Sequence, residues 1–337
     1  MKMKIVIATF LLFNVAIAAL GGNPVEVLNF IERKKTIVKL YDVNAKETLH
    51  IDNRYGDVQV VLWDKSSIRI DITITANASS ESRVNDILNS VKINDKVGDN
   101  QISVKTTISS PGNRVQWAGN SLRIDYLIQM PERTPLNLKN SFGDTDIVRF
   151  LAPLTVETEY GTFRARDLEN KTNTIMVRFG NAQIGQMQEG RVDSRYSEVK
   201  LDKVHVLELV NKFGSLNIGE VASLNADIGY SGTKIGSLKE RGIVKLQFSD
   251  AFSIGELTAE NVDIDASYSS IVLPAKTSSK FDVKVTYGNF QYPPKTPMVF
   301  IKQPSGNTTK EYEGVIGHED PKSVIKVNSR FGNVKLK

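Results

Sequence analysis

A short motif recurs along most of this chain: an aromatic residue, then Gly or Ser, then a small or polar residue. From residue 142 to residue 287 the aromatic returns after 18, 19, 17, 17, 17, 18, 20 and 19 residues. A regular period of this length indicates units that cannot bury an apolar face alone and therefore stack on one another. The aromatic residues are Tyr55, Phe142, Tyr160, Phe179, Tyr196, Phe213, Tyr230, Phe248, Tyr268, Tyr287 and Phe331.

Apolar and polar residues alternate on both sides of the aromatic, which predicts strands with one buried face. Ile175 and Val177 precede Phe179 in step with it, whereas Ala182 and Ile184 follow it out of step. A two-residue period changes phase only where the chain bulges or turns a corner. We place that corner at the Gly or Ser after the aromatic, because glycine tolerates backbone angles that other residues resist. Each unit is therefore predicted to be a strand, a corner, a second strand and a turn.

These units predict an all-β fold: a single-stranded parallel β-helix or β-solenoid with repeats of about 18 residues and coils about 4.8 Å apart. Because the aromatic continues the phase of the strand before it, we expect the rings to form a ladder inside one corner. An antiparallel meander would need tight turns such as Asn-Gly or Asp-Gly, and none separates these units. Phe and Tyr alternate from Phe142 to Tyr268, which leaves open whether one or two motifs make a coil; we favour one.

The chain before the array has a different pattern. Residues 1–18 combine a basic start, an apolar run and an Ala-x-Ala exit, which predict a signal peptide. Residues 19–135 are predicted to form a β-rich N-terminal cap with one helix, because residues 79–91 place apolar positions at helical spacing after a serine cap. Residues 24–35 are predicted to be a short helix or an unfolded tail. Strands of the cap are expected within residues 48–63, 67–76, 91–94, 101–108 and 122–130.

The repeat array is assigned to residues 136–337. Residues 292–322 interrupt its period and are rich in Pro and Gly, so we expect a loop insertion there. The motif resumes in residues 324–337, which are expected to close the stack.

Composition narrows the possible functions. The chain has no Cys, which excludes disulfides, thiol catalysis and an anchor attached through a cysteine. It has 43 Lys and Arg against 38 Asp and Glu, and this small, scattered excess argues against nucleic acid as a partner. No second apolar run follows the signal peptide, so we expect no transmembrane span after cleavage. The predicted location is the periplasm, the outer membrane surface or the outside of the cell.

A basic residue directly precedes the aromatic in several motifs. Arg178, Arg195 and Lys212 do so in three consecutive units, and Arg54 and Arg330 do so elsewhere. Stacked units would align these side chains into a possible basic binding stripe for an anionic glycan. The alternative interpretation is a solvated face on which charges pair between coils.

The sequence offers little support for catalysis. His50, His205 and His318 are far apart and lack the spacing of metal ligands. Neither a phosphate-binding glycine loop nor a nucleophile elbow occurs. A polysaccharide-active β-helix enzyme would need clustered carboxylates, and the nearest candidates are the pairs Asp144 with Asp146 and Asp263 with Asp265. We predict no catalytic, cofactor-binding or metal site.

Three stretches together resemble a known family. They are residues 50–64 with the first aromatic motif, the segment 79–91, and residues 126–131 leading into 138–144. In this order they resemble the putative adhesin family of bacterial envelope proteins with β-strand repeats, a domain family of unknown function. The resemblance implies an exported or envelope-attached β-solenoid without catalytic residues.

The combined prediction is an exported, non-enzymatic β-solenoid that acts as an adhesin or as a structural or binding protein of the envelope. Its expected partner is an anionic glycan or an envelope protein. A polysaccharide-active β-helix enzyme and an envelope-sensing component are the alternatives.

Overall fold

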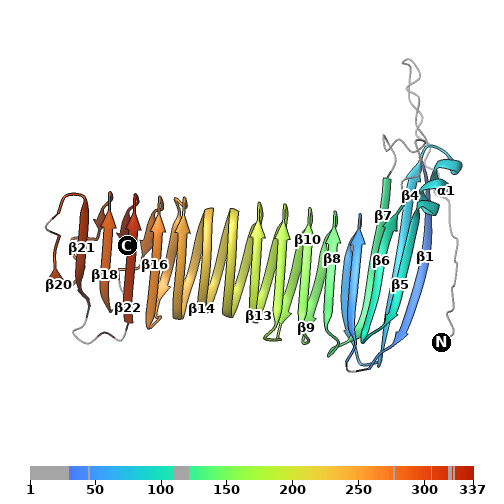
Figure 1. Ribbon diagram of the computed structural model, residues 1–337, viewed down its shortest axis with the longest axis horizontal. Coiled ribbons are helices and arrows are strands. Elements are labelled where there is room, and N and C mark those ends of the chain that lie inside the picture. Colours follow the sequence, from blue (N-terminus) through green and yellow to red (C-terminus); the bar gives the residue numbers. More distant parts are fainter. Residues whose placement is uncertain are drawn as a thin grey trace, which may run out of the picture. The chain divides into compact units, whose positions relative to one another are not determined.

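The computed structural model describes residues 30–44, 46–109, 121–275, 278–304, 306–317, 321 and 323–337. Within these residues the protein is all-β apart from one helix, and its strands belong to a mixed sheet (Figure 1). The expected signal peptide lies outside the described residues. The chain divides into two compact units, residues 1–147 and 148–337, whereas the sequence places a boundary after residue 135.

The first unit consists of one helix, α1 (Glu81–Ser90), and the strands β1 (Ile31–Asp42), β2 (Thr48–Arg54), β3 (Val58–Trp63), β4 (Ser67–Ala78), β5 (Val91–Gly98), β6 (Gln101–Ile108), β7 (Ser121–Pro131), β8 (Leu136–Ser141) and β9 (Thr145–Phe150), the last of which reaches into the second unit. β4 pairs antiparallel with β1 and β7, and β5 pairs antiparallel with β6. β2 pairs parallel with both β6 and β8. Strands that are distant in the chain therefore lie side by side in this unit.

The helix and most strands of the first unit follow the sequence prediction. Ser80 caps α1, and its Oγ accepts a hydrogen bond from the Arg83 backbone N–H at 3.4 Å. Val84 and Ile87 form the buried face of the helix. In the described part of the chain, no helix is both long and apolar enough to cross a membrane.

One element of the first unit is missing from the prediction. A short helix or an unfolded tail is expected over residues 24–35, but β1 begins at Ile31 and pairs with β4 along its whole length. Every second residue of β4 is fully buried, which gives the long strand β1 a stable neighbour. Pairing between distant segments, rather than the local pattern of β1, determines this strand.

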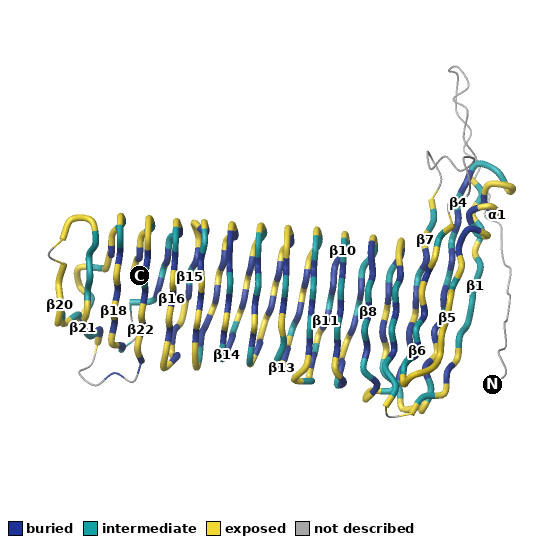
Figure 2. Tube along the Cα trace, in the orientation of Figure 1, coloured by how far each residue is buried: buried dark blue, intermediate teal, exposed yellow. Residues whose placement is uncertain are grey.

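The second unit contains the strands β10 (Leu154–Glu159), β11 (Thr162–Leu168), β12 (Asn173–Arg178), β13 (Asn181–Arg195), β14 (Glu198–Gln247), β15 (Phe252–Leu257), β16 (Asn261–Ser267), β17 (Ile271–Leu273), β18 (Ser279–Thr286), β19 (Phe290–Gln291), β20 (Met298–Lys302), β21 (Thr309–Ile316), β22 (Ser323–Arg330) and β23 (Val334–Leu336). β10 pairs parallel with β12, and β11 with β13. Thr162, Asn181 and Glu198 are level with one another across β11, β13 and β14. Equivalent positions of successive motifs therefore form rows, and buried and exposed residues alternate along the strands (Figure 2).

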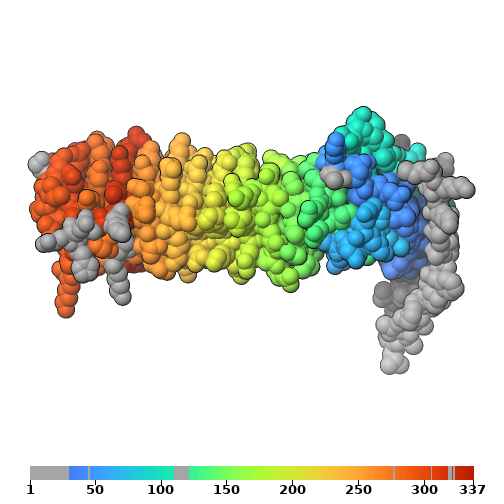
Figure 3. All heavy atoms as spheres, turned by 90° about the horizontal axis from the view of Figure 1, so that it is seen from below, coloured from blue at the N-terminus to red at the C-terminus, as the bar shows by residue number. Residues whose placement is uncertain are grey.

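The strand order in the second unit departs from the chain order at one place. β22 pairs parallel with β16 on one side and with β18 on the other. β23 likewise pairs with both β17 and β19. Residues 323–336 are thus inserted between segments that precede them in the chain, and the red spheres of these residues lie between orange ones in Figure 3.

Two features of the second unit differ from the prediction. The strictly parallel pairing expected of a solenoid is not what the sheet shows, because β21 pairs antiparallel with both β18 and β20. The loop insertion expected at residues 292–322 contains these two strands, β20 and β21. The prolines and the other glycines lie outside these strands and Gly314 lies within β21, so a composition typical of loops conceals two strands.

Candidate binding surface along the aromatic row

Every aromatic residue of the recurring motif has a left-handed backbone, with φ between 51° and 62°. This conformation costs a residue other than glycine about 1–2 kcal/mol. It also breaks the alternation of inward and outward side chains that the preceding strand follows. The ring therefore points away from the core, although its position in the alternation would place it inside. Phe179 is 47% exposed and Tyr196 is 54% exposed. The expectation of a ring ladder inside the corner is therefore wrong, because the phase changes at the aromatic itself.

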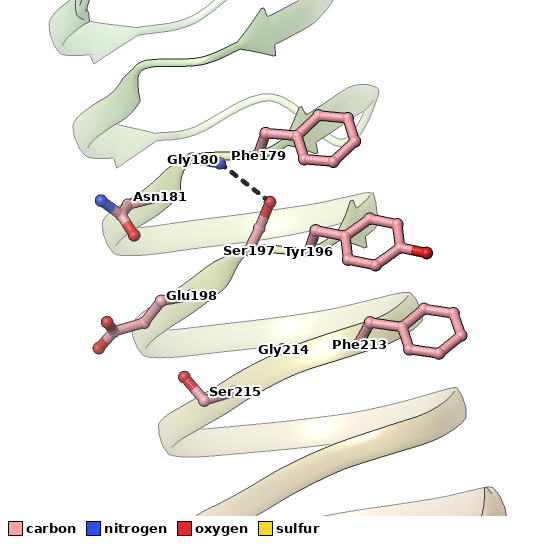
Figure 4. Close-up of a pocket in the computed structure, with 9 residues that line it drawn as sticks. All are labelled: Phe179, Gly180, Asn181, Tyr196, Ser197, Glu198, Phe213, Gly214 and Ser215. Carbon is pink, nitrogen blue, oxygen red and sulfur yellow. Dashed lines mark hydrogen bonds between the residues drawn. The ribbon is translucent and has the colours of Figure 1, made fainter.

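The residue after the aromatic points inward and has to be small. A Cβ atom on Gly180 would lie 2.0 Å from the carbonyl oxygen of Gly161 in the preceding motif. Glycine is needed there for close approach, not for a positive φ as the sequence interpretation assumes. Where serine takes this position it links two motifs: the Ser197 Oγ accepts from the Gly180 backbone N–H at 3.3 Å and donates to the Arg195 carbonyl at 2.7 Å (Figure 4).

The outward rings of the second unit stack on one another in a continuous row, called here the ring row. Neighbouring ring centroids are 4.7–5.2 Å apart, and neighbouring planes differ by 4–11°. The ring faces cover one another, so the row presents mainly ring edges to solvent. In spatial order the row consists of Tyr160, Phe179, Tyr196, Phe213, Tyr230, Phe248, Tyr268, Phe331 and Tyr287.

Tyr and Phe alternate without exception along the ring row. In chain order the alternation fails, because Tyr268 is followed by Tyr287. The insertion of β22 places Phe331 between these two tyrosines, at centroid distances of 4.7 and 5.0 Å. The first unit has one stacked pair of the same kind, Tyr55 on Phe142 at 5.2 Å.

A shallow groove of about 590 Å³ follows three consecutive motifs of the ring row. In Figure 4 the rings of these motifs point to one side, and Asn181, Glu198 and Ser215 point to the other. The Gly and Ser residues at the corner lie between the two sides. The groove thus combines ring edges and the Tyr196 hydroxyl with a row of neutral or acidic polar groups.

The predicted basic stripe lies beside the rings, on the strand that precedes them. Arg178, Arg195 and Lys212 occupy level positions on neighbouring strands. Each of these basic side chains contacts a carboxylate. A distant anion therefore meets a nearly neutral pair rather than an isolated positive charge. A binding role for these residues remains a prediction. The pairs are Arg178 with Glu157 at 3.4 Å, Arg195 with Asp193 at 3.2 Å and Lys212 with Asp227 at 2.7 Å.

The candidate catalytic groups do not assemble into a site in the described residues. Asp144 and Asp146 belong to the first unit, whereas Asp263 and Asp265 belong to the second. Asp265 pairs with Arg330 at 3.6 Å. Within the described ranges, no three or more His, Asp or Glu side chains form a group that could hold a metal ion.

The histidines show no shared site. A ring nitrogen of His50 is 3.3 Å from the Asn137 side-chain amide in the first unit. His205 is exposed on β14 in the second unit. His318 lies outside the described residues.

Comparisons with known proteins return structural neighbours only. No protein-family model and no curated protein sequence matches the chain. A putative cell adhesion protein from Clostridium sporogenes covers 90% of this chain and is itself covered completely (100%), with 16% identity and a TM-score of 0.21. A putative adhesin from Bacteroides fragilis covers 90%, is covered to 97%, and has 13% identity and a TM-score of 0.36. A putative adhesin from Parabacteroides merdae covers 90%, is covered to 96%, and has 11% identity and a TM-score of 0.36.

Proposed function

We propose that the parallel strands of the second unit form a β-solenoid whose ring row is a binding surface. The protein is an exported, non-catalytic, adhesin-like component of the cell envelope. The observation that carries this proposal is the ring row: nine aromatic side chains held half-exposed on a left-handed backbone.

Every member of the ring row carries backbone strain. A left-handed backbone costs about 1–2 kcal/mol per residue, and a stacked aromatic pair contributes about 0.5–1.5 kcal/mol. A continuous row has roughly one stacked pair per ring, and about half of each ring is also buried, so stacking and burial together offset the backbone cost. Glycine at the same position would avoid the backbone cost entirely. Backbone strain of this kind clusters at functional sites, and here it keeps rings at the surface.

The form of the row favours an elongated partner. Neighbouring ring centroids are 4.7–5.2 Å apart, so equivalent side chains recur at nearly constant intervals. The carboxylates beside Arg178, Arg195 and Lys212 leave an anionic glycan little uncompensated positive charge. The proposal therefore places recognition on the rings and the adjoining polar groups rather than on the basic stripe.

The proposed location is the periplasm, the outer membrane surface or the extracellular space. It is supported by the pattern of residues 1–18 and by the absence of Cys in the sequence. Fractionation of cells tests it directly, and recovery of the protein from the cytoplasm would contradict it.

Replacing rings with glycine tests the binding surface without disturbing the corner. We expect the triple variant Tyr196→Gly, Phe213→Gly and Tyr230→Gly to keep the native circular dichroism spectrum, because glycine readily adopts a left-handed backbone. Its binding to isolated envelopes should fall at least tenfold. The matched control is the charge reversal Arg178→Glu, Arg195→Glu and Lys212→Glu, which should bind nearly as well as the native protein. Loss of binding in the control alone would move the site to the basic stripe.

The absence of catalysis is part of the proposal. Incubating the full chain with polysaccharides should release no new reducing ends. Steady release of reducing ends, removed by Asp263→Asn or Asp265→Asn, would support the polysaccharide-active alternative instead.

A further inference from the structure

The Tyr and Phe alternation in the ring row is independent of the packing beneath it. The corner residues of three consecutive motifs are all serine: Ser231, Ser249 and Ser269. The rings that precede them are nevertheless Tyr, Phe and Tyr in turn. Elsewhere Gly accompanies both ring types. Corner packing therefore does not decide which ring is used.

Ring stacking does not decide it either, because Tyr and Phe present the same ring to their neighbours. They differ by one hydroxyl at the outer end of the side chain. No described residue forms a hydrogen bond with the hydroxyls of Tyr196, Tyr230 or Tyr268, so these groups are available to a ligand. The alternation thus produces one hydroxyl for every second coil, at intervals of about 10 Å given the spacing of parallel strands.

We infer that the ring row, together with the groove along its Phe179, Tyr196 and Phe213 motifs, binds a linear 1,4-β-linked glycan, with one disaccharide for every two coils. This inference rests on the proposed function and specifies its ligand class. In an extended 1,4-β-linked chain each sugar is rotated by half a turn from the one before it. Identical groups therefore return at every second sugar, at nearly the interval of the tyrosine hydroxyls. An extended polypeptide repeats after about 7 Å and would lose register within a few coils.

The opposite side of the groove suits a neutral glycan. Asn181, Glu198 and Ser215 line it at equivalent positions of successive motifs. These side chains can accept hydrogen bonds from sugar hydroxyls, and Asn181 and Ser215 can also donate them. They include one carboxylate and no cation. The Glu198 carboxylate would repel an anionic group at its own position. Ring edges on one side and polar groups on the other thus match the apolar and hydroxyl-bearing surfaces of a neutral sugar chain.

Calorimetric titration of the full chain with oligosaccharides of two, four, six and eight sugars tests the inference. Cello- and chito-oligosaccharides are the 1,4-β-linked probes, and malto-oligosaccharides of equal length are the 1,4-α-linked controls. We expect the affinity for 1,4-β-linked probes to increase with each added disaccharide, because each one engages another tyrosine. The α-linked probes, whose chains curl, should show no such increase. Equal affinity for both linkages would overturn the inference.

Three variants that keep the stacked rings separate the period from the number of hydroxyls. The triple variant Tyr196→Phe, Tyr230→Phe and Tyr268→Phe should bind the eight-sugar probe at least tenfold more weakly. The double variant Phe213→Tyr with Tyr230→Phe keeps the number of hydroxyls but disrupts their spacing, and it should also lose the gain with length. The control Tyr292→Phe removes one exposed hydroxyl outside the ring row and should bind normally. Native affinity in the double variant would show that spacing is irrelevant and would overturn the inference.

Failure of the inference is distinguishable from failure of the proposed function. If no 1,4-β-linked probe binds but the glycine triple variant still loses envelope binding, the ligand class is wrong and the binding surface remains. If the glycine triple variant binds envelopes normally, both proposals fail.

Discussion

The two units use the same aromatic corner but support it in different ways. In the first unit the residue two positions before the aromatic is Asn53 or Asn140, and both are fully buried. The Asn53 amide donates to the Ile124 carbonyl at 3.0 Å and to the Asn140 Oδ1 at 3.2 Å, and its own Oδ1 accepts from Thr106 at 3.1 Å. In the second unit the equivalent Asn211 donates only to Ser194, at 2.6 Å.

The number of hydrogen bonds that these asparagines make differs because the two corners lie between different kinds of strands. In the first unit, β2 lies between two strands that come much later in the chain, and a buried polar network specifies that arrangement. The network continues to Tyr126, whose hydroxyl is 2.8 Å from the Thr106 hydroxyl, and burial raises the pKa of Tyr126 to about 12. In the second unit, similar motifs stack on similar motifs, and rows of repeated side chains suffice. Specific hydrogen bonds are thus concentrated where the pairing is unique.

The largest expected effect tests whether the two units are stabilised separately. Ile72→Ala removes a fully buried side chain from β4 and should destabilise the first unit by about 2–5 kcal/mol. Hydrogen exchange should show the loss of protection within residues 31–147. The matched change Ile218→Ala, also fully buried, should act within residues 148–337 instead. A uniform loss across both units in either variant would contradict the comparison.

The next effect contrasts the two asparagines. Asn53→Ala leaves several buried groups without partners and should reduce the free energy of unfolding by about 2–3 kcal/mol. Asn211→Ala should cost about 1 kcal/mol or less, because Asn211 makes a single hydrogen bond and its Oδ1 has no partner among the described residues. Urea unfolding measures both values. Equal losses would show that the polar network of the first unit has no special role.

A smaller effect tests the backbone at the ring row. In most strands glycine is less stable than alanine by about 0.5–1 kcal/mol. At Phe213 we expect the opposite order: Phe213→Gly should be more stable than Phe213→Ala by about 1 kcal/mol, since only alanine retains the left-handed strain. Lys234, an exposed residue of β14 without a positive φ, is the control and should show the usual order. Thermal unfolding of the four variants compares the two positions.

The smallest effect concerns acid stability of the first unit. Burial alone would raise the pKa of Asp95, but hydrogen bonds from Lys39 and Tyr41 and the Lys39 charge outweigh it and lower this pKa. The stabilisation is therefore present above the ordinary pKa of an aspartate and disappears as the pH falls through the lowered value. Because the pair is partly exposed, we expect less than about 1 kcal/mol.

Asp95→Asn should flatten this acid dependence in the first unit, as measured by hydrogen exchange between about pH 5 and pH 2. Glu169→Gln serves as the control in the second unit, where Arg149 lowers the pKa of an exposed carboxylate through hydrogen bonds. An unchanged acid profile in Asp95→Asn would show that the contact with Lys39 contributes nothing to stability.

The local sequence pattern is sufficient to predict those elements whose own residues show a clear apolar spacing. Helix α1 is visible from its serine cap and from the spacing of Val84 and Ile87. The alternating isoleucines of β4 likewise identify a strand with one buried face. By contrast, β1 carries charged residues such as Arg33 and Lys35 within its pattern, and only its pairing with β4 shows it to be a strand.

The candidate site is only partly visible in the sequence. The period identifies the rings, but periodicity alone does not reveal a left-handed backbone, and the rings are therefore assigned to the wrong side of the strand. The insertion of β22 depends on contacts between distant segments. One local sign of it exists: the alternation breaks between Tyr268 and Tyr287, and Phe331 is the ring that restores it.

The inserted strand β22 also determines the order of assembly during synthesis. In the folded protein β22 lies between β16 and β18 and pairs with both. Residues 279–291, which include β18, nevertheless leave the ribosome before residues 323–336, which include β22. Until translation has passed residue 336, β16 and β18 each expose an unpaired edge to other chains. The pairing between β16, β22 and β18 is therefore completed only after β22 has been synthesised. A nascent chain halted before residue 323 is prone to misassembly.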